Sequence, residues 1–283
     1  MIVDAHHHFW DPDHADYPWM SKELDPIRRR FGPEDLEPLL AKTGTDRTIL
    51  VQTRSSIDES REFLSIAAGS PIVIGVVGWV DLTAAGVGDA IASLRDGPGG
   101  ERLIGIRHQV HDEPDPAWLL SHYVRRGVEA VGAAGLVYEL LVRSRELPSA
   151  LQVARAMPDV RFVIDHLAKP PIQEARLRPW ADLIAPFGEL ANVSCKVSGL
   201  VTEADWAAWR PDDVRPFVDH AIDVFGPDRL IFGSDWPVCL LAATYEQVHD
   251  LARASLDGLS DSEQGQVFGG NASRIYRLNV AGI

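Results

Sequence analysis

The sequence of 283 residues predicts a (β/α)8 barrel of the TIM type, in which eight parallel strands alternate with helices. Three observations lead to this fold class. Short apolar runs recur at spacings of about 24 to 45 residues, amphipathic segments with capping signals separate them, and no Gly-rich dinucleotide fingerprint follows the first run. That fingerprint is typical of the rival fold, an open doubly wound sheet. We expect residues 1–283 to form a single barrel domain.

Each expected strand is a short run rich in β-branched residues, with apolar side chains on consecutive positions. Such runs lack the alternation of a half-exposed strand, and they are typical of parallel sheets that are covered on both faces. The eight runs are Ile2–Val3, Thr48–Val51, Ile72–Val77, Leu103–Ile106, Leu136–Tyr138, Arg161–Ile164, Ala191–Cys195 and Leu230–Phe232.

Capping signals predict where several of the helices begin. The spacing of a capping box is found in Ser56 with Glu59, Thr244 with Gln247, and Ser260 with Glu263. The first of these helices should run to Gly69. Asp115 and Pro116 predict the cap and the first-turn proline of a helix that ends near Gly135. Residues 11–32, rich in Asp, Pro and Arg, should form a long loop over the mouth of the barrel.

Composition excludes several classes of partner. The chain has 27 basic and 41 acidic residues, for a net charge of −14, which disfavours binding to nucleic acid or to an anionic membrane. Its 46% hydrophobic and 24% charged residues are typical of a globular protein. Two cysteines, Cys195 and Cys239, and no visible secretory signal favour a cytoplasmic location. A homo-oligomer through the outer helices stays open.

Two histidines follow the first expected strand. His6 and His8 are two residues apart, so on an extended segment both rings project to the same side. Because functional residues of such barrels gather at the carboxyl ends of the strands, this pair is a candidate site for a divalent metal. The alternative is a pair of hydrogen-bonded loop histidines.

Further acid and base candidates follow later strands. Asp235 comes after the eighth run, where a carboxylate can bind metal and also take a proton from water; the alternative is a turn cap before Pro237. His166 comes after the sixth run, and its alternative is an imidazole bonded to nearby backbone. Glu139 ends the fifth strand and faces either the barrel or a neighbouring helix, which the sequence leaves undecided.

Cationic side chains also cluster after the expected strands, where a ligand would lie. They are Arg54, Arg107, His108, Lys169 and Lys196. Such donors can hold hydroxyl or carboxylate oxygens or stabilise an oxyanion, and the alternative for each is ordinary salt bridging.

The remaining aromatic and basic residues carry weaker signals. Trp236, with Trp10 and Trp19, is a candidate platform for a sugar ring, although buried loop aromatics look the same in a sequence. Tyr17 and Arg143 receive no role. The histidines interpreted as structural or solvent-exposed are His14, His111, His122, His220 and His249.

Several segments of the chain match a known family in the same order. They are DAHHHFWD at residues 4–11, VQTR at 51–54, GIRH at 105–108, DHLAKP at 165–170, CKVSGL at 195–200, GSDWP at 233–237 and FGGNA at 268–272. Together they resemble the amidohydrolase superfamily, in the branch of sugar-lactone hydrolases that includes fuconolactonases, rhamnonolactonases and pyrone-dicarboxylate lactonases. Two positions depart from the family pattern: Ala168 replaces the usual Gly, and Glu139 stands where many members have Asp.

The resemblance implies a barrel in which His6, His8 and Asp235 cluster, with His166 close by. It also implies one divalent ion, expected to be zinc, with Glu139 or His166 completing the set of ligands. Members of this branch differ over metal, so a metal-independent enzyme stays open.

Three functions are compatible with these residues. The leading hypothesis is hydrolysis of a small sugar lactone to the open hydroxy acid, with Asp235 as the general base. The second is metal-dependent decarboxylation of an aromatic or unsaturated acid. The third is a barrel that binds sugar acids without turning them over, which the joint presence of Asp235, His6, His8 and His166 disfavours.

Overall fold

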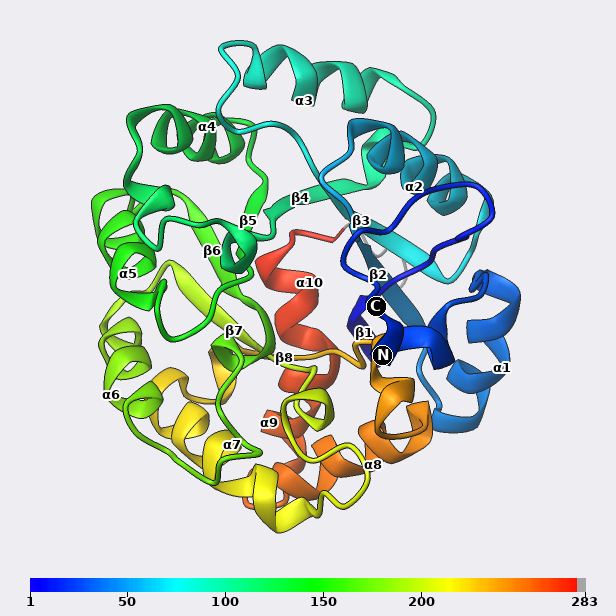
Figure 1. The fold of residues 1–283 in the computed structure, drawn as a ribbon, viewed down its shortest axis with the longest axis vertical. Coiled ribbons are helices and arrows are strands. Elements are labelled where there is room, and N and C mark those ends of the chain that lie inside the picture. The colour runs from blue at the N-terminus through cyan, green and yellow to red at the C-terminus, as the bar shows by residue number, and fades with distance from the viewer. Residues whose placement is uncertain (279–283) are drawn as a thin grey trace.

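The computed structural model describes residues 1–278, and its core is an eight-stranded parallel sheet in the order β1 to β8 (Figure 1). The strands are β1 (Val3–His7), β2 (Arg47–Val51), β3 (Val73–Gly78), β4 (Leu103–His108), β5 (Val137–Leu140), β6 (Arg161–Ile164), β7 (Val193–Val197) and β8 (Leu230–Phe232). All eight predicted runs overlap a strand. Their side chains are nearly all buried, which explains why the runs lack alternation.

The sheet closes through the segment that follows β8. His7 pairs with Trp236 in a parallel bridge, and two backbone hydrogen bonds of 2.7 Å join the same segments, from Asp235 N to His6 O and from His8 N to Trp236 O. The barrel is therefore closed, as the sequence predicts, and the open doubly wound sheet is excluded.

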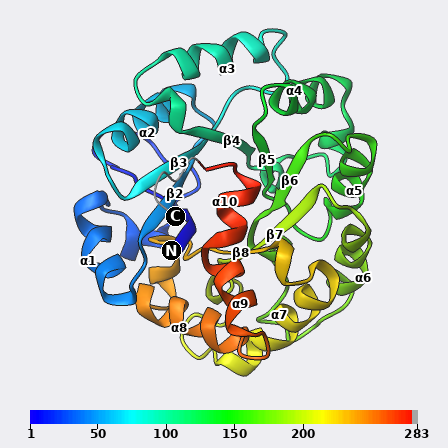
Figure 2. The same cartoon turned by 180° about the vertical axis from the view of Figure 1, so that it is seen from behind.

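Helices surround the strands (Figures 1 and 2). They are α1 (Pro33–Thr43), α2 (Ile57–Gly69), α3 (Val87–Asp96), α4 (His122–Ala133), α5 (Leu147–Ala156), α6 (Trp180–Ile184), α7 (Pro211–Phe225), α8 (Tyr245–Ser255), α9 (Asp261–Gly265) and α10 (Asn271–Ile275). Helix α10 lies across the barrel at the amino ends of the strands, where Arg161, the first residue of β6, donates to the backbone oxygen of Ile275 (Figure 2). No helix within residues 1–278 combines the length and the apolar character needed to cross a bilayer.

One predicted capping box and one predicted helix start need correction, whereas α2 begins after Ser56 and ends at Gly69 as predicted. Ser56 caps α2 by accepting from the backbone N–H of Glu59, but the Glu59 carboxylate binds the backbone N–H groups of Thr53 and Arg54 instead of returning to Ser56. Asp115 does not begin α4, because its carboxylate accepts from Ala117 N within a turn and the helix starts only after Ser121. The boxes at Thr244 and Ser260 are confirmed, with both reciprocal bonds present.

The long loop after β1 covers the mouth of the barrel. Its ends are tied by a pair of backbone hydrogen bonds between Trp10 and Phe31, and its own side chains Tyr17, Met20 and Ile27 are buried. Apolar burial of these side chains orders a segment whose composition alone is typical of a flexible loop. The predicted position of residues 11–32 over the mouth is confirmed.

Candidate active site

A cavity of about 690 Å³ opens at the carboxyl ends of the strands. Its lining residues are His8, Pro18, Trp19, Leu24, Thr53, Arg107, Gln109, His111, Asp112, Leu141, Arg143, His166, Lys169, Thr202, Glu203, Trp206, Asp235, Val238 and Leu241. Polar groups of both signs alternate with aromatic and aliphatic walls, so the cavity is suited to a small ligand that carries several hydroxyl groups.

Asp235 lies at the centre of three imidazole rings. Its Oδ1 is 3.3 Å from Nε2 of His8, 3.8 Å from Nε2 of His6 and 3.9 Å from Nε2 of His166. Burial raises the pKa of this carboxyl, but the neighbouring rings of His166 and His8 outweigh burial, and the net pKa lies below the ordinary value. Asp235 is therefore a carboxylate at neutral pH.

Hydrogen bonds behind the rings turn their Nε2 atoms toward Asp235. Nδ1 of His8 lies 2.7 Å from the backbone oxygen of Val51, which can only accept, so this nitrogen carries the proton of the neutral ring. Nε2 of His8 then keeps its lone pair for a metal or a substrate proton. Nδ1 of His166 lies 2.9 Å from the hydroxyl oxygen of Ser198.

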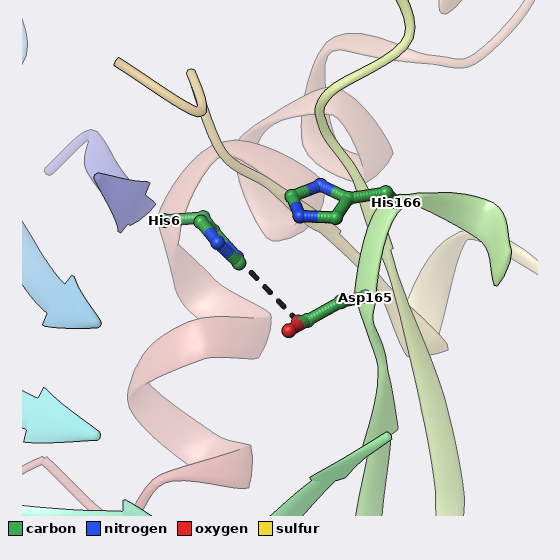
Figure 3. Close-up of side chains that lie close together, drawn as sticks. All are labelled: His6, Asp165 and His166. Atoms are coloured by element: carbon green, nitrogen blue, oxygen red, sulfur yellow. Dashed lines mark ion pairs between the residues drawn. The ribbon is translucent and has the colours of Figure 1, made fainter. Parts of the chain in front are cut away.

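Two groups of three donors could hold a metal ion among residues 1–278. One is His6, His8 and Asp235, and the other is His6, Asp165 and His166; within each group the ligand atoms lie within 4.8 Å of one another. Figure 3 shows the second group, with His6 facing both Asp165 and His166. The first group contains three of the predicted ligands, and imidazole with carboxylate is a donor set that zinc accepts.

Asp165 is a site residue that sequence reasoning missed. Its Oδ1 lies 3.5 Å from Nδ1 of His6, and its Oδ2 lies 3.0 Å from Nη1 of Arg107. Burial raises the pKa of this carboxyl, but Lys196, His6 and Arg107 together hold it well below the ordinary value. The available signal was its place directly after the apolar run of β6, next to His166.

Lys196 and Glu139 form a buried network between the cavity and helix α10. The Lys196 ammonium lies 2.7 Å from Glu139 Oε1 and 3.1 Å from Asp165 Oδ1, and the hydroxyl of Tyr276 donates to Glu139 Oε1. Both Lys196 and Glu139 have no exposed surface. Burial raises the pKa of Glu139 to about 7. Neither residue lines the cavity, and Glu139 belongs to neither group of metal donors among residues 1–278.

Two of the predicted cationic residues do line the cavity. Nη1 of Arg107 lies 3.1 Å from Nε2 of His6 and also binds Asp165, and its Nη2 donates to the backbone oxygen of Gln52. Lys169 donates to Glu203 Oε1 at 2.5 Å. Both cations are therefore already paired where they line the cavity.

Three further candidates are not among the cavity-lining residues of the described chain. Arg54 pairs with Glu59 at 3.3 Å. Nδ1 of His108 accepts from the indole N–H of Trp79 at 3.0 Å, and Nε2 of His108 lies 2.8 Å from Oε1 of Glu113. The third, the indole of Trp236, is 1% exposed and packs edge-on against two phenylalanine rings in the core.

The cavity wall also contains residues to which the sequence assigned no function. Arg143 follows β5 and lines the cavity, and its position after a strand was the signal for it. His111, interpreted from the sequence as structural or solvent-exposed, lines the cavity as well. Burial, followed by the nearby charges of Lys169 and Arg143, lowers the pKa of His111 to about 3.

The backbone after β6 is strained where it carries site residues. His166, Leu167, Ala168 and Lys169 have φ angles of 53°, 51°, 59° and 51°, and Asp235 has a φ of 58°. This left-handed region favours glycine, which accounts for the Gly of the family pattern at this position, and Ala168 adopts the same conformation with a Cβ atom. Such strain concentrates at functional sites, and here it turns His166 toward Asp235.

Comparison with known proteins agrees with this geometry. The model of the family described as Amidohydrolase matches residues 3–278. The chain belongs to the amidohydrolase family. It is 39% identical to an L-fucono-1,5-lactonase of Burkholderia ambifaria, over 98% of this chain and 96% of the relative.

Solved structures extend this comparison. The structure of an amidohydrolase of Burkholderia multivorans with bound zinc matches this chain with 37% sequence identity and a TM-score of 0.94, over 98% of this chain and 99% of the other. A 2,6-dihydroxybenzoate decarboxylase matches with a TM-score of 0.67 and 15% identity, over 98% of this chain and 99% of the other. At that identity the likeness shows a shared fold alone, so it gives the decarboxylase hypothesis no further support.

Proposed function

We propose that this amidohydrolase hydrolyses a small sugar lactone, of the class of L-fucono-1,5-lactone, to the open hydroxy acid. The observation that carries the proposal is the Asp235 carboxylate, ringed by three imidazoles in a cavity with cationic walls. The relative that is 39% identical over nearly the whole chain is an L-fucono-1,5-lactonase, which supports this substrate class.

Asp235 would act as the general base. Its depressed pKa keeps it ionised at neutral pH, so it can take a proton from water as the water oxygen attacks the lactone carbonyl. The developing oxyanion would be stabilised by the cationic donors of Arg107 and Lys169 in the cavity wall. When the ring C–O bond breaks, protonated Asp235 returns its proton to the leaving alkoxide, and the product is a hydroxy acid.

A divalent ion, which we take to be zinc, fits the donors of His6, His8 and Asp235, with His166 beside them. The support is that Nε2 of His8 is fixed as an acceptor by the bond from Nδ1 to Val51 O. A bound ion would polarise a lactone carbonyl and lower the pKa of a water molecule. The residues of the cavity wall would orient the substrate whether or not an ion is bound.

The decisive experiment replaces Asp235 with asparagine, which keeps the size and removes the basicity. Turnover of aldonolactones, followed with a pH indicator, should fall by about 10² to 10⁴. Asp112→Asn, at another carboxylate of the cavity wall, is the matched control and should keep turnover within about tenfold. Metal content is measured on all three proteins, because the amide is also a weaker ligand.

Two results would contradict the proposal. Asp235→Asn with unchanged metal content and turnover within a few-fold of the parent would mean that Asp235 is not the base. A parent enzyme that releases acid from no lactone but decarboxylates an aromatic acid would overturn the substrate class.

A further inference from the structure

Arg107 contacts Nε2 of His6, the nitrogen through which His6 would bind a metal ion together with Asp235. Its Nη1 lies 3.1 Å from Nε2 of His6, and the same nitrogen faces Asp235 Oδ1 at 3.8 Å. His6 is also the residue that the two groups of metal donors share. The guanidinium and a metal bound to the first group would therefore approach one atom from the same side of the ring.

The protonation of the His6 ring follows from its neighbours. Nη1 of Arg107 can only donate, so Nε2 of His6 accepts from it and the proton of the neutral ring belongs on Nδ1, which lies 3.5 Å from Asp165 Oδ1. Lys196 also lies 3.1 Å from Nδ1, but its ammonium has Glu139 and Asp165 as acceptors. Nε2 is thus the unprotonated nitrogen, with its lone pair toward Arg107.

A guanidinium is a donor and never an acceptor, so the contact between Arg107 and Nε2 uses that lone pair. Zinc bonds an imidazole nitrogen through the same lone pair, at about 2.0 to 2.1 Å. One lone pair cannot serve both, and the charges of guanidinium and metal repel each other.

We propose that Arg107 competes with a divalent ion for Nε2 of His6, so that this guanidinium lowers the metal affinity of the site. Arg107 is well placed for that role, because Asp165 and the Gln52 carbonyl hold its guanidinium against the His6 ring. The inference rests on the metal ligands named under the proposed function and does not depend on lactone hydrolysis.

The test measures zinc affinity by competition with a chromophoric chelator at fixed pH. Arg107→Met removes the donor and keeps the length of the side chain, and Asp165 retains Lys196 as its partner. Losing one charge-assisted hydrogen bond should tighten zinc binding by about ten- to a hundredfold. Arg143→Met removes the same charge from the same cavity without freeing His6, and it should change the affinity by no more than about threefold.

Equal tightening in both variants would reduce the effect to general electrostatics and overturn the proposal, as would an unchanged or weaker affinity in Arg107→Met. A second measurement needs no variant. In crystals of the parent protein soaked in zinc, the contact from Arg107 to His6 should be broken. Zinc held by His8, Asp235 and His166 with that contact intact would also overturn the proposal.

Discussion

Replacing Lys196 with methionine should lower the free energy of unfolding by about 3 to 5 kcal/mol, the range for removing one partner of a buried ion pair. The Lys196 ammonium has no exposed surface and lies within 3.1 Å of carboxylate oxygens of both Glu139 and Asp165. Methionine fills a similar volume, so the loss comes from the two acids left behind. Asp165 keeps Arg107 at 3.0 Å, whereas Glu139 keeps, among residues 1–278, only the hydroxyl of Tyr276.

The size of this loss should depend on pH. Burial already raises the pKa of Glu139 to about 7 in the presence of Lys196, and removing the ammonium raises it further. At pH 6 Glu139 is protonated in the folded variant at little cost. At pH 8 the parent holds Glu139 ionised against Lys196, while the folded variant must take a proton from solution. The loss should therefore be larger at pH 8 than at pH 6, by about 1 kcal/mol or more.

Urea denaturation followed by circular dichroism at both pH values measures this effect. Glu139→Gln and the double variant complete a cycle, and the double variant should lose at least about 1 kcal/mol less than the sum of the single variants. A Lys196→Met protein within about 1 kcal/mol of the parent, or strictly additive losses, would refute the reasoning that this lysine neutralises buried acids.

Two further predictions concern stability. The folded pKa of His111, about 3, lies below its unfolded value of 6.5, so the unfolded chain binds more protons and the parent should lose stability as pH falls below 6.5. In His111→Gln the decline in melting temperature between pH 7.5 and pH 5 should be smaller, and an equal decline would exclude His111 as a source of acid sensitivity. Glu59→Ala should cost about 2 to 4 kcal/mol in urea, since it strands the backbone N–H groups of Thr53 and Arg54. Exposed Glu62 on the same helix is the control, and Glu62→Ala with an equal loss would contradict the assignment.

The sequence predicted the site residues that follow the strands better than the buried residues inside the strands. His166 and Asp235 follow their strands, and barrel topology alone brings all such positions to one mouth. Lys196 and Glu139 lie one step earlier, inside β7 and β5, where an inward side chain points at the opposite strands. Whether such a residue meets ligand or a buried partner depends on the depth of the barrel and on helix α10, which no local pattern encodes.

Capping predictions were wrong where a polar side chain had two possible partners nearby. Asp115 precedes a proline, as helix caps often do, but its carboxylate closes a short turn and the chain continues through a 3-10 helix at Trp118–Leu120 before α4. Glu59 has the spacing of a capping box, yet the buried N–H groups of Thr53 and Arg54 lie within its reach and take its carboxylate. Such tertiary competition is invisible to spacing rules.

The bonds that close the barrel lie within the candidate active site. Backbone hydrogen bonds join Asp235 to His6 and His8 to Trp236. The proposed metal donors His6, His8 and Asp235 therefore lie on the two segments whose pairing closes the barrel, which we call the seam. Asp235 follows β8, so its contacts with His6 and His8 cannot form while the chain has folded only as far as β7. The enzyme should therefore gain its activity in a single late step of folding, when the end of the chain returns to its beginning, and a ligand that bridges the seam should slow the opening of the ring.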